Sequence, residues 1–263
     1  MKVFITGASS GIGEALATEY AKRFQNKDTI IGLVARRSEH LQQLQFKLEE
    51  TYKIKCAIYP LDVRHQLALA TAAADFMQQH GTPDIVIACA GVSRGTLTEH
   101  VEDIAAFQAI MDINVMGLVH TFQPFIAAMR QAGQGQLVGV ASVAGIRGLP
   151  GAGAYSASKA AAISYLESLR VEMAQDNIAV TTIAPGYIRT PMTDVNQYKM
   201  PFLMDADVFA HKFANAVENK RRFCVIPWQM GWVARLMRLI PPLLWDFAVK
   251  KAPHKKRLDW DWL

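Results

Sequence analysis

The sequence predicts an α/β protein with a doubly wound parallel sheet that carries helices on both faces. Three observations support this fold class. Short runs of Val, Ile and Ala alternate with longer segments of helical periodicity along the first 226 of the 263 residues. The short runs are almost continuously apolar, as expected of strands that helices cover on both faces. A glycine-rich turn joins the first run to the first helical segment. Repeated units of this kind form parallel sheets with right-handed crossovers.

The first half of the chain holds four strand–helix units. The strands are short apolar or β-branched runs, at residues 2–6, 29–35, 54–59 and 84–89. The segments that follow them have apolar residues three and four apart, or are rich in charge or alanine, at residues 11–24, 39–52, 66–79 and 104–131. Such periodicity predicts helices that cover the sheet.

The second half continues the pattern and then departs from it. Strands are predicted at residues 136–141, 178–183 and 222–226, and helices at residues 154–174 and 205–219. Between these lies a loop at 187–207 that is irregular and rich in proline and methionine. No linker or repeat divides the chain, so we expect one domain. Residues 1–226, with the loop 187–207 as a substrate lid, form its catalytic part, and residues 227–263 an apolar and basic extension.

Composition narrows the class of protein. Hydrophobic residues make up 51% and charged residues 19%, which is typical of a globular chain. The three cysteines are far apart and form no cluster with histidine, so neither a disulfide framework nor a metal site is predicted. The sequence contains no motif of a nucleic-acid reader, and its first residues lack the apolar core of a signal peptide. We therefore expect a cytoplasmic protein without a nucleic-acid partner.

The turn after the first strand is suited to a pyrophosphate. It reads Thr-Gly-Ala-Ser-Ser-Gly-Ile-Gly over residues 6–13, and a helix follows. Glycine permits a tight turn and a close approach of backbone to phosphate, while the helix N-terminus supplies N–H groups and a positive dipole end. A glycine-rich turn alone is a weak signal, but the strand–turn–helix context predicts dinucleotide binding. The contacting residues would be Gly7, Ser9, Ser10, Gly11, Ile12 and Gly13.

The end of the second strand indicates which dinucleotide is bound. Arg36 and Arg37 follow that strand, and no Asp or Glu occupies residues 33–38. A carboxylate at this place would favour the ribose hydroxyl of NAD, whereas a guanidinium suits the 2′-phosphate of NADP. We therefore predict NADP(H) in preference to NAD(H). An arginine pair that is merely solvated is the alternative.

Tyr155 and Lys159 are the candidates for proton transfer. Their spacing of four places both on one face of the predicted helix 154–174. A tyrosine titrates near pH 10, and a neighbouring ammonium would lower that pKa, so that the phenol could act as general acid or base. Ser142 ends the preceding strand, where its hydroxyl could bond a substrate oxygen or simply cap a turn.

With these motifs the chain resembles a known family, the single-domain short-chain dehydrogenases/reductases. The resemblance covers about residues 1–226. The matching motifs are Thr6-Gly7-x-x-x-Gly11-x-Gly13, Asp62-Val63, Ala90-Gly91, Asn114 in Asn-Val-x-Gly, Ser142, Tyr155-x-x-x-Lys159, and Pro185-Gly186 with Thr190. The resemblance implies a Rossmann fold and a hydride transfer between a nicotinamide and a carbonyl or secondary alcohol. It also implies a homodimer or homotetramer formed through helices near 113–131 and 154–174.

The resemblance further implies a role for each matched residue. Tyr155 would donate or accept the proton, Lys159 would lower the pKa of Tyr155 and hold the nicotinamide ribose, and Ser142 would orient the substrate oxygen. Asn114 would hold a water in a relay from Lys159. The remaining matched residues would contact the cofactor: Asp62, Val63, Ala90, Gly91, Pro185, Gly186, Ile188 and Thr190. Read without the family, Asn114 is only an asparagine inside a helix.

One motif departs from the family's pattern. The family commonly has Asn-Asn-Ala-Gly after the fourth strand, whereas this chain has Ala88-Cys89-Ala90-Gly91. We expect cofactor binding to survive and a side-chain hydrogen bond worth about 1 kcal/mol to be missing. Cys89 is expected to be a small buried apolar residue, not a reactive thiol.

The last quarter of the chain carries the basic charge. Residues 199–263 hold 12 Lys and Arg against 6 Asp and Glu, whereas residues 1–198 hold 16 against 17. Residues 228–257 combine this charge with Trp, Leu and Met, a composition found in helices that lie in a membrane interface. The same segment could instead cover the substrate cleft or a subunit interface. Either reading favours a hydrophobic carbonyl or alcohol substrate. A silent NADP(H)-binding sensor is the alternative function.

Overall fold

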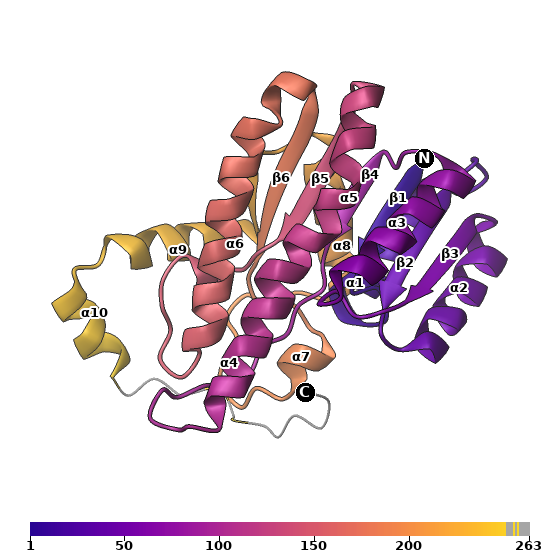
Figure 1. Cartoon of the computed structure of the whole chain (residues 1–263). Helices are drawn as coiled ribbons and strands as arrows, with labels where there is room; N and C mark the ends of the chain where they lie inside the picture. The colour runs from indigo at the N-terminus through magenta and orange to yellow at the C-terminus, as the bar shows by residue number, and fades with distance from the viewer. Residues whose placement is uncertain (251–254, 256, 258–263) are drawn as a thin grey trace.

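The computed structural model describes residues 1–250, 255 and 257 (Figure 1). Seven strands form one parallel sheet in the order β3-β2-β1-β4-β5-β6-β7. The strands are β1 (Lys2–Thr6), β2 (Ile30–Ala35), β3 (Lys55–Pro60), β4 (Ile85–Ala88), β5 (Gly135–Val140), β6 (Ile178–Pro185) and β7 (Phe223–Ile226). The predicted fold class is confirmed, and each predicted strand agrees with an observed one to within two residues at either end.

Helices cover both faces of the sheet. They are α1 (Gly11–Arg23), α2 (Ser38–Tyr52), α3 (Gln66–His80), α4 (Asp103–Met111), α5 (Gly117–Ala132), α6 (Gly153–Glu172), α7 (Pro191–Asp194), α8 (Ala206–Glu218), α9 (Trp228–Leu239) and α10 (Pro242–Val249). Side chains alternate across each strand, so Val3 and Ile5 join one core cluster with α1, α2 and α8. Phe4 points the other way and joins a second cluster with α3, α5 and α6.

The chain reverses its winding direction between β1 and β4. Strands β2 and β3 lie on one side of β1, and the chain then crosses to β4 on the other side. The register pairs Thr6 with Ala88, so both strands end at the same level. In doubly wound sheets a crevice opens at this point, outside the carboxyl ends of the strands. The fold therefore fixes where a ligand can bind.

The predicted helix 104–131 is interrupted by one turn of π-helix at Asp112–Met116, which separates α4 from α5. Hydrophobic periodicity did not reveal this turn, because the apolar spacing continues across it. Among the described residues, the stretch Asp103–Ala132 is the one helix whose length and composition would suffice to cross a membrane. Its inner side chains, including Leu118, Phe122 and Phe125, belong to the sheet core, which accounts for its apolar character.

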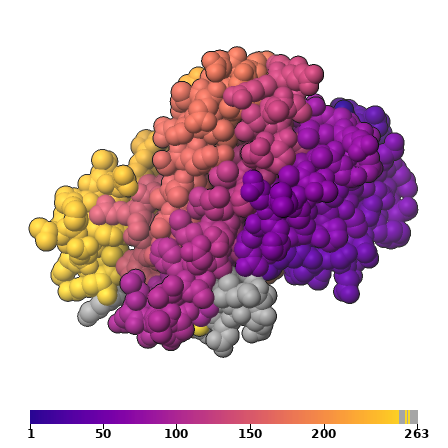
Figure 2. Space-filling view, viewed as in Figure 1, coloured from indigo at the N-terminus to yellow at the C-terminus, as the bar shows by residue number. Residues whose placement is uncertain are grey.

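The segments after β6 and β7 differ from expectation in detail. The irregular loop contains the short helix α7, and a backbone bridge pairs Ile188 with Met204. The apolar segment from 228 to 250 forms two helices, because Pro241 has no N–H group to continue α9. We call α9 and α10 the C-terminal arm. It projects from the β6–β7 side of the molecule and stands out as a separate lobe (Figures 1 and 2).

Arg147 fastens the C-terminal arm to the body. It lies in the loop between β5 and α6, and its Nη1 donates to the carbonyl oxygens of Met237 and Ile240, the latter at 2.7 Å. Its guanidinium carbon is 4.5 Å from the ring centroid of Trp245 on α10. In the opposite direction, Arg238 donates to the Ile146 carbonyl oxygen at 3.0 Å. The arm therefore rests on the loop that leads into α6.

Candidate active site

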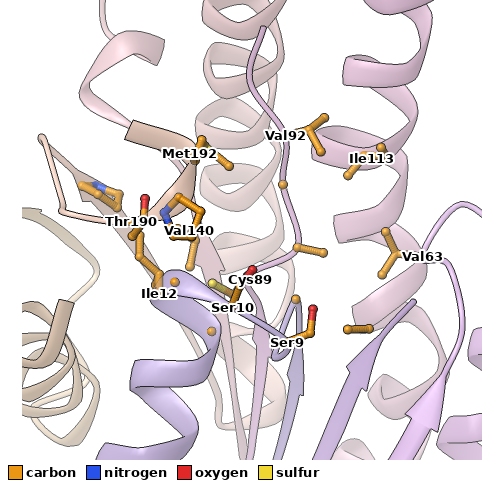
Figure 3. Close-up of a pocket in the computed structure, with 18 of the residues that line it drawn as sticks. Ser9, Ser10, Ile12, Val63, Cys89, Val92, Ile113, Val140, Thr190 and Met192 are labelled. Carbon is orange, nitrogen blue, oxygen red and sulfur yellow. The ribbon is translucent and has the colours of Figure 1, made fainter. Parts of the chain in front are cut away.

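A cavity of about 490 Å³ opens beyond the carboxyl ends of the central strands. Figure 3 shows Ser9, Ser10 and Ile12 at its base, Val63, Val92 and Ile113 on one side, and Thr190 and Met192 on the other. Every residue that the sequence predicted to contact the cofactor lines this cavity, and so does Ser142. Asn114 is the one predicted site residue that does not line it. Sequence motifs spread from Gly7 to Thr190 thus converge on one cavity.

The glycine-rich turn forms the base of the cavity. Gly7 adopts a left-handed φ of +75°. A Cβ on Gly13 would lie 2.1 Å from the Gly7 carbonyl oxygen, so only glycine permits this close crossing of the turn and α1. The side chain of Ser10, the cap residue of α1, makes no capping hydrogen bond within the described part of the chain. The first N–H groups of α1 are thus left for a ligand, which suits a pyrophosphate.

Three arginines and one carboxylate lie at the end of the cavity near β2 and β3. Arg37 Nη2 donates to the backbone oxygen of Ser9 at 3.2 Å and to its hydroxyl at 3.1 Å. Arg36 Nη1 lies 3.9 Å from Asp62 Oδ2. Burial acts to raise the pKa of Asp62, but hydrogen bonds from Arg64 and the nearby charge of Arg36 hold that pKa below its usual value. One anion against three cations leaves this end positive.

Tyr155, Lys159 and Ser142 meet in the middle of the cavity. Tyr155 and Lys159 lie on α6, and Lys159 Nζ is 5.9 Å from the centroid of the Tyr155 ring. Lys159 is buried and donates to the Val140 carbonyl oxygen at 2.9 Å. Ser142 lies at the end of β5, where its hydroxyl accepts from the Ala144 N–H at 3.1 Å and also bonds the Tyr155 side chain. Ser142 is thus both a turn cap and a partner of the phenol.

The pKa of Tyr155 moves in the direction opposite to the one expected. Burial raises the pKa of the phenol, and the hydrogen bond with Ser142 opposes this only in part. Burial also lowers the pKa of Lys159 to about 8. Desolvation disfavours the charged form of each group, and it outweighs the attraction between them that the sequence suggested. At neutral pH the phenol keeps its proton, and the amine is still largely charged.

Asn114 lies in the π-turn between α4 and α5. It does not line the cavity, but it contacts Val92, which does. Its Oδ1 accepts from the Val92 N–H at 2.8 Å, and its Nδ2 donates to the Val92 oxygen at 3.0 Å and to the Ser158 hydroxyl at 2.9 Å. A Cβ placed on Gly91 would lie 3.3 Å from Asn114 Oδ1 and 3.5 Å from Lys159 Nζ. Asn114 therefore ties the loop after β4 to α6 close to the amine.

The side chain of Thr6 joins the ends of β1 and β4. Its buried hydroxyl accepts from the N–H groups of Cys89 and Ala90 at 3.3 and 3.4 Å. Burial raises the pKa of the Cys89 thiol to about 12, so Cys89 is a neutral thiol, as expected.

The sequence reading missed two apolar residues of the cavity wall, Val92 and Ile113. Val92 directly follows the predicted Ala90-Gly91 motif, so a longer reading of that motif would have found it. Met192, from the loop expected to form an apolar substrate lid, also lines the cavity. The rings of Tyr187 and Tyr198 meet edge to face with centroids 6.3 Å apart. Burial raises the pKa of Tyr198 to about 12.

Two residues near the end of the chain also reach this region. Lys255 Nζ donates to the Ser93 hydroxyl at 2.9 Å and to the Met192 carbonyl oxygen at 3.5 Å. Arg257 pairs with Asp103 at 2.7 Å and with Glu102 at 3.1 Å. No signal in the sequence indicated these contacts, because 162 residues separate Lys255 from Ser93.

Comparison with known families gives a match over most of the chain. Residues 1–200 match the family model described as short chain dehydrogenase. An uncharacterized oxidoreductase of Myxococcus xanthus is 33% identical over 249 residues, which cover 94% of this chain and 95% of that protein. The 11-beta-hydroxysteroid dehydrogenase A of Sesamum indicum is 34% identical over 290 residues, which cover 98% of this chain and 80% of that protein.

A solved structure agrees with the fold. L-sorbose reductase from Gluconobacter frateurii, in complex with NADPH and L-sorbose, superposes with a TM-score of 0.73 and 25% identity. The match covers 82% of this chain and 88% of that one.

Proposed function

This chain belongs to the short-chain dehydrogenase/reductase family, and on that premise we propose that it transfers a hydride between NADP(H) and a lipophilic carbonyl compound or secondary alcohol. Its class is that of a nicotinamide-dependent oxidoreductase acting on C–OH and C=O groups. The preference for NADP(H), the lipophilic substrate and the role of each residue are the proposal. The observation that carries it is the meeting of Ser142, Tyr155 and Lys159 in one cavity with the glycine-rich turn.

The protein residues supply the proton chemistry. The nicotinamide, when bound, supplies or accepts the hydride. Tyr155 keeps its proton at neutral pH because burial raises its pKa, so in the reductive direction it donates from Oη to the carbonyl oxygen. The Ser142 hydroxyl orients that oxygen, and the Lys159 ammonium provides positive charge beside the phenol. Asn114 holds the loop after β4 against α6. Asn114 is also proposed to bind a water molecule that relays protons from Lys159.

The cofactor preference rests on charge. Arg36 and Arg37 line the cavity at the end of β2, and Arg64 lies next to them on Asp62. A 2′-phosphate would meet net positive charge here, and guanidinium groups bind phosphate oxygens with two parallel hydrogen bonds. Asp62 is already bonded by Arg64, which weakens its competition for a ribose hydroxyl. Gly7, Ser9 to Gly13, Val63, Ala90, Gly91, Pro185, Gly186, Ile188 and Thr190 are proposed to hold the rest of the cofactor.

The proposed lipophilic substrate follows from the wall of the cavity. Val92, Ile113 and Met192 are apolar and face the space above the turn (Figure 3). An apolar wall favours a ligand whose body is hydrophobic, with few polar groups to fix its orientation.

We also propose a homodimer or homotetramer. Ile104 and Phe107 on α4 and Met116 in the π-turn are 41 to 64% exposed, and Val171 on α6 is 64% exposed. Apolar side chains at such a surface are typical of subunit interfaces. Sedimentation analysis of wild type and of Phe107→Glu would test this, because a buried glutamate would separate the subunits.

A screen of carbonyl compounds, ordered by chain length and ring size, tests the proposed function through NADPH absorbance. We expect NADPH oxidation with some lipophilic carbonyl compounds. Tyr155→Phe should lower kcat at least about 100-fold, the low end for a lost general acid, while NADPH binding is retained. Unchanged turnover in Tyr155→Phe would contradict the assignment of Tyr155 as the general acid. NADPH binding with no turnover across the screen would favour the silent sensor instead.

A further inference from the structure

The amine of Lys255 lies at the mouth of the cavity, between its two walls. Ser93 follows the cavity residue Val92 on one wall, and Met192 lies on the other. Lys255 Nζ contacts both, through the Ser93 hydroxyl and the Met192 carbonyl oxygen. In Figure 3, Val92 and Met192 face each other across the opening that leads away from the glycine-rich turn. Lys255 is therefore placed at the substrate end of the cleft and not at the phosphate end.

Arg257, two residues after Lys255, is held by a buried carboxylate. Arg257 Nε lies 2.7 Å from Asp103 Oδ2, and Asp103, at the start of α4, is only 3% exposed. Asp103 also accepts from the Leu97 N–H at 2.9 Å and lies 3.7 Å from Arg94. A buried carboxylate with such partners holds Arg257 in place. Lys255, two residues earlier, lies at the opening.

The charge of Lys255 is not balanced in the part of the chain that the structure describes. Its two acceptors are neutral oxygens, and no described Asp or Glu lies within ion-pair distance of it. Asp103 and Glu102 are engaged by Arg257. Burial of the amine lowers its pKa to about 8, which still leaves it mostly charged at neutral pH. A half-buried ammonium with three N–H groups and two neutral acceptors favours an anionic oxygen as its third partner.

We propose that Lys255 is a specificity-determining residue that binds an acidic group of the substrate, remote from the carbon that reacts. The substrate class is then an amphipathic oxo- or hydroxy-acid. Its carboxylate pairs with Lys255, and its apolar body lies along Val92, Ile113 and Met192. This inference rests on the proposed function, which supplies the reaction, and it adds the chemical class of the compound.

The test compares oxo-acids of increasing chain length with their methyl esters, using NADPH absorbance. Wild type should prefer an acid over its ester by at least about 10-fold in kcat/KM, the low end for a charge-assisted hydrogen bond. Lys255→Met should abolish the preference by lowering the value for acids, with the value for esters unchanged. Lys255→Arg should retain the preference. Lys250→Met, a change of an exposed lysine on the C-terminal arm, is the matched control and should have no effect.

A binding measurement separates this inference from the proposed function. An unreactive fatty acid, titrated calorimetrically into the complex with NADP⁺, should bind wild type about 10-fold more tightly than Lys255→Met. If the binding difference is found but no carbonyl compound is reduced, the acid site stands and the proposed reaction fails. If wild type reduces acids and esters equally well, the acid site fails and the reaction stands. Weaker NADPH binding in Lys255→Met, with equal losses for acids and esters, would also overturn the proposal.

Discussion

At the scale of single residues, burial decides the charge states of the site. Tyr155 and Lys159 lie within one helical turn of each other, yet both are driven toward their neutral forms. For Tyr155 this is the form that the proposed reduction needs as its proton donor. Lys159 stays charged mainly below its lowered pKa, so in the proposed reaction its charge would set an upper limit of pH.

We predict an alkaline limb in the pH profile of reduction. Lys159 loses its proton as the pH rises through about 8, whereas the raised pKa of Tyr155 keeps the phenol protonated there. The value of kcat/KM, which reports the free enzyme, should thus fall above about pH 8. In Lys159→Arg, whose guanidinium stays charged, the remaining activity should show no such limb. A profile that stays flat to pH 10, or a limb that persists in Lys159→Arg, would contradict this account.

A second prediction at this scale concerns Arg36. Arg36→Ala should weaken NADPH binding about 10- to 100-fold, as expected for lost hydrogen bonds to a charged group, and leave NADH binding within about twofold. Fluorescence titration of both cofactors measures this. Lys53→Ala, which removes an exposed charge paired with Glu50 away from the cavity, is the control. Equal losses for the two cofactors would mean that Arg36 does not read the 2′-phosphate.

At the scale of elements, close backbone crossings place the catalytic side chains. The turn at Gly7 passes directly under Gly13 of α1. The loop after β5 crosses α6 in the same manner, because a Cβ on Gly145 would lie 2.5 Å from the backbone carbon of Lys159. Ser142, at the start of that loop, is thereby held against the helix that carries Tyr155. The sequence analysis did not single out Gly145.

Gly13→Ala should damage the turn. Its Cβ would overlap the Gly7 carbonyl, which belongs to backbone and cannot rotate away. We expect a loss of stability of about 1–3 kcal/mol and at least about 10-fold weaker NADPH binding. Gly153→Ala is the matched control, since that glycine also lies in the first turn of a helix and a Cβ there meets no atom within 4 Å. Thermal unfolding and cofactor titration of both variants decide the matter. Equal behaviour would contradict the steric argument.

Sequence patterns predicted the helices, strands and turns that depend on residues close together in the sequence. The apolar runs of β1 to β7 and the periodicity of α1, α3 and α6 lie within short windows, and the glycine turn is likewise a local feature. Features that depend on tertiary contacts escaped prediction. The π-turn contains Asn114, which contacts Val92, and the raised pKa of Tyr155 follows from burial. Lys255 and Arg257 contact Ser93 and Asp103, which lie more than 150 residues earlier in the chain. The division of the chain at residue 226 stays a prediction.

At the scale of the whole molecule, the C-terminal arm exposes an unusual set of side chains. Trp228, Trp232, Leu236 and Leu239 follow each other at helical spacing along α9, and Leu243, Leu244 and Phe247 continue on α10. Each is at least 62% exposed. Arg235 stacks on Trp232 and Lys250 on Phe247, while Asp246 is the one acidic residue from 228 to 250. Such a surface, apolar with basic charge and tryptophan, suits an anionic lipid interface.

We propose that the C-terminal arm docks peripherally on membranes with anionic lipids. Wild type should co-sediment with vesicles that contain phosphatidylserine and bind purely zwitterionic vesicles less. Trp232→Glu together with Leu236→Glu should abolish the binding, because charge would enter the apolar stripe. Phe46→Glu on α2, 70% exposed and far from the arm, is the control. An unchanged bound fraction in the double variant would refute the proposal, and a change in subunit number instead would assign the stripe to a subunit interface.

The clamp at Arg147 has a consequence for control of the enzyme. Arg147 and Arg238 fasten the arm to the loop after β5, and the same loop carries the hydroxyl of Ser142 near its start and leads into α6. We propose that a compound that separates Trp245 from Arg147 would loosen this loop from outside. Such an inhibitor would act at the periphery of the molecule and would not compete with the nucleotide for the cavity.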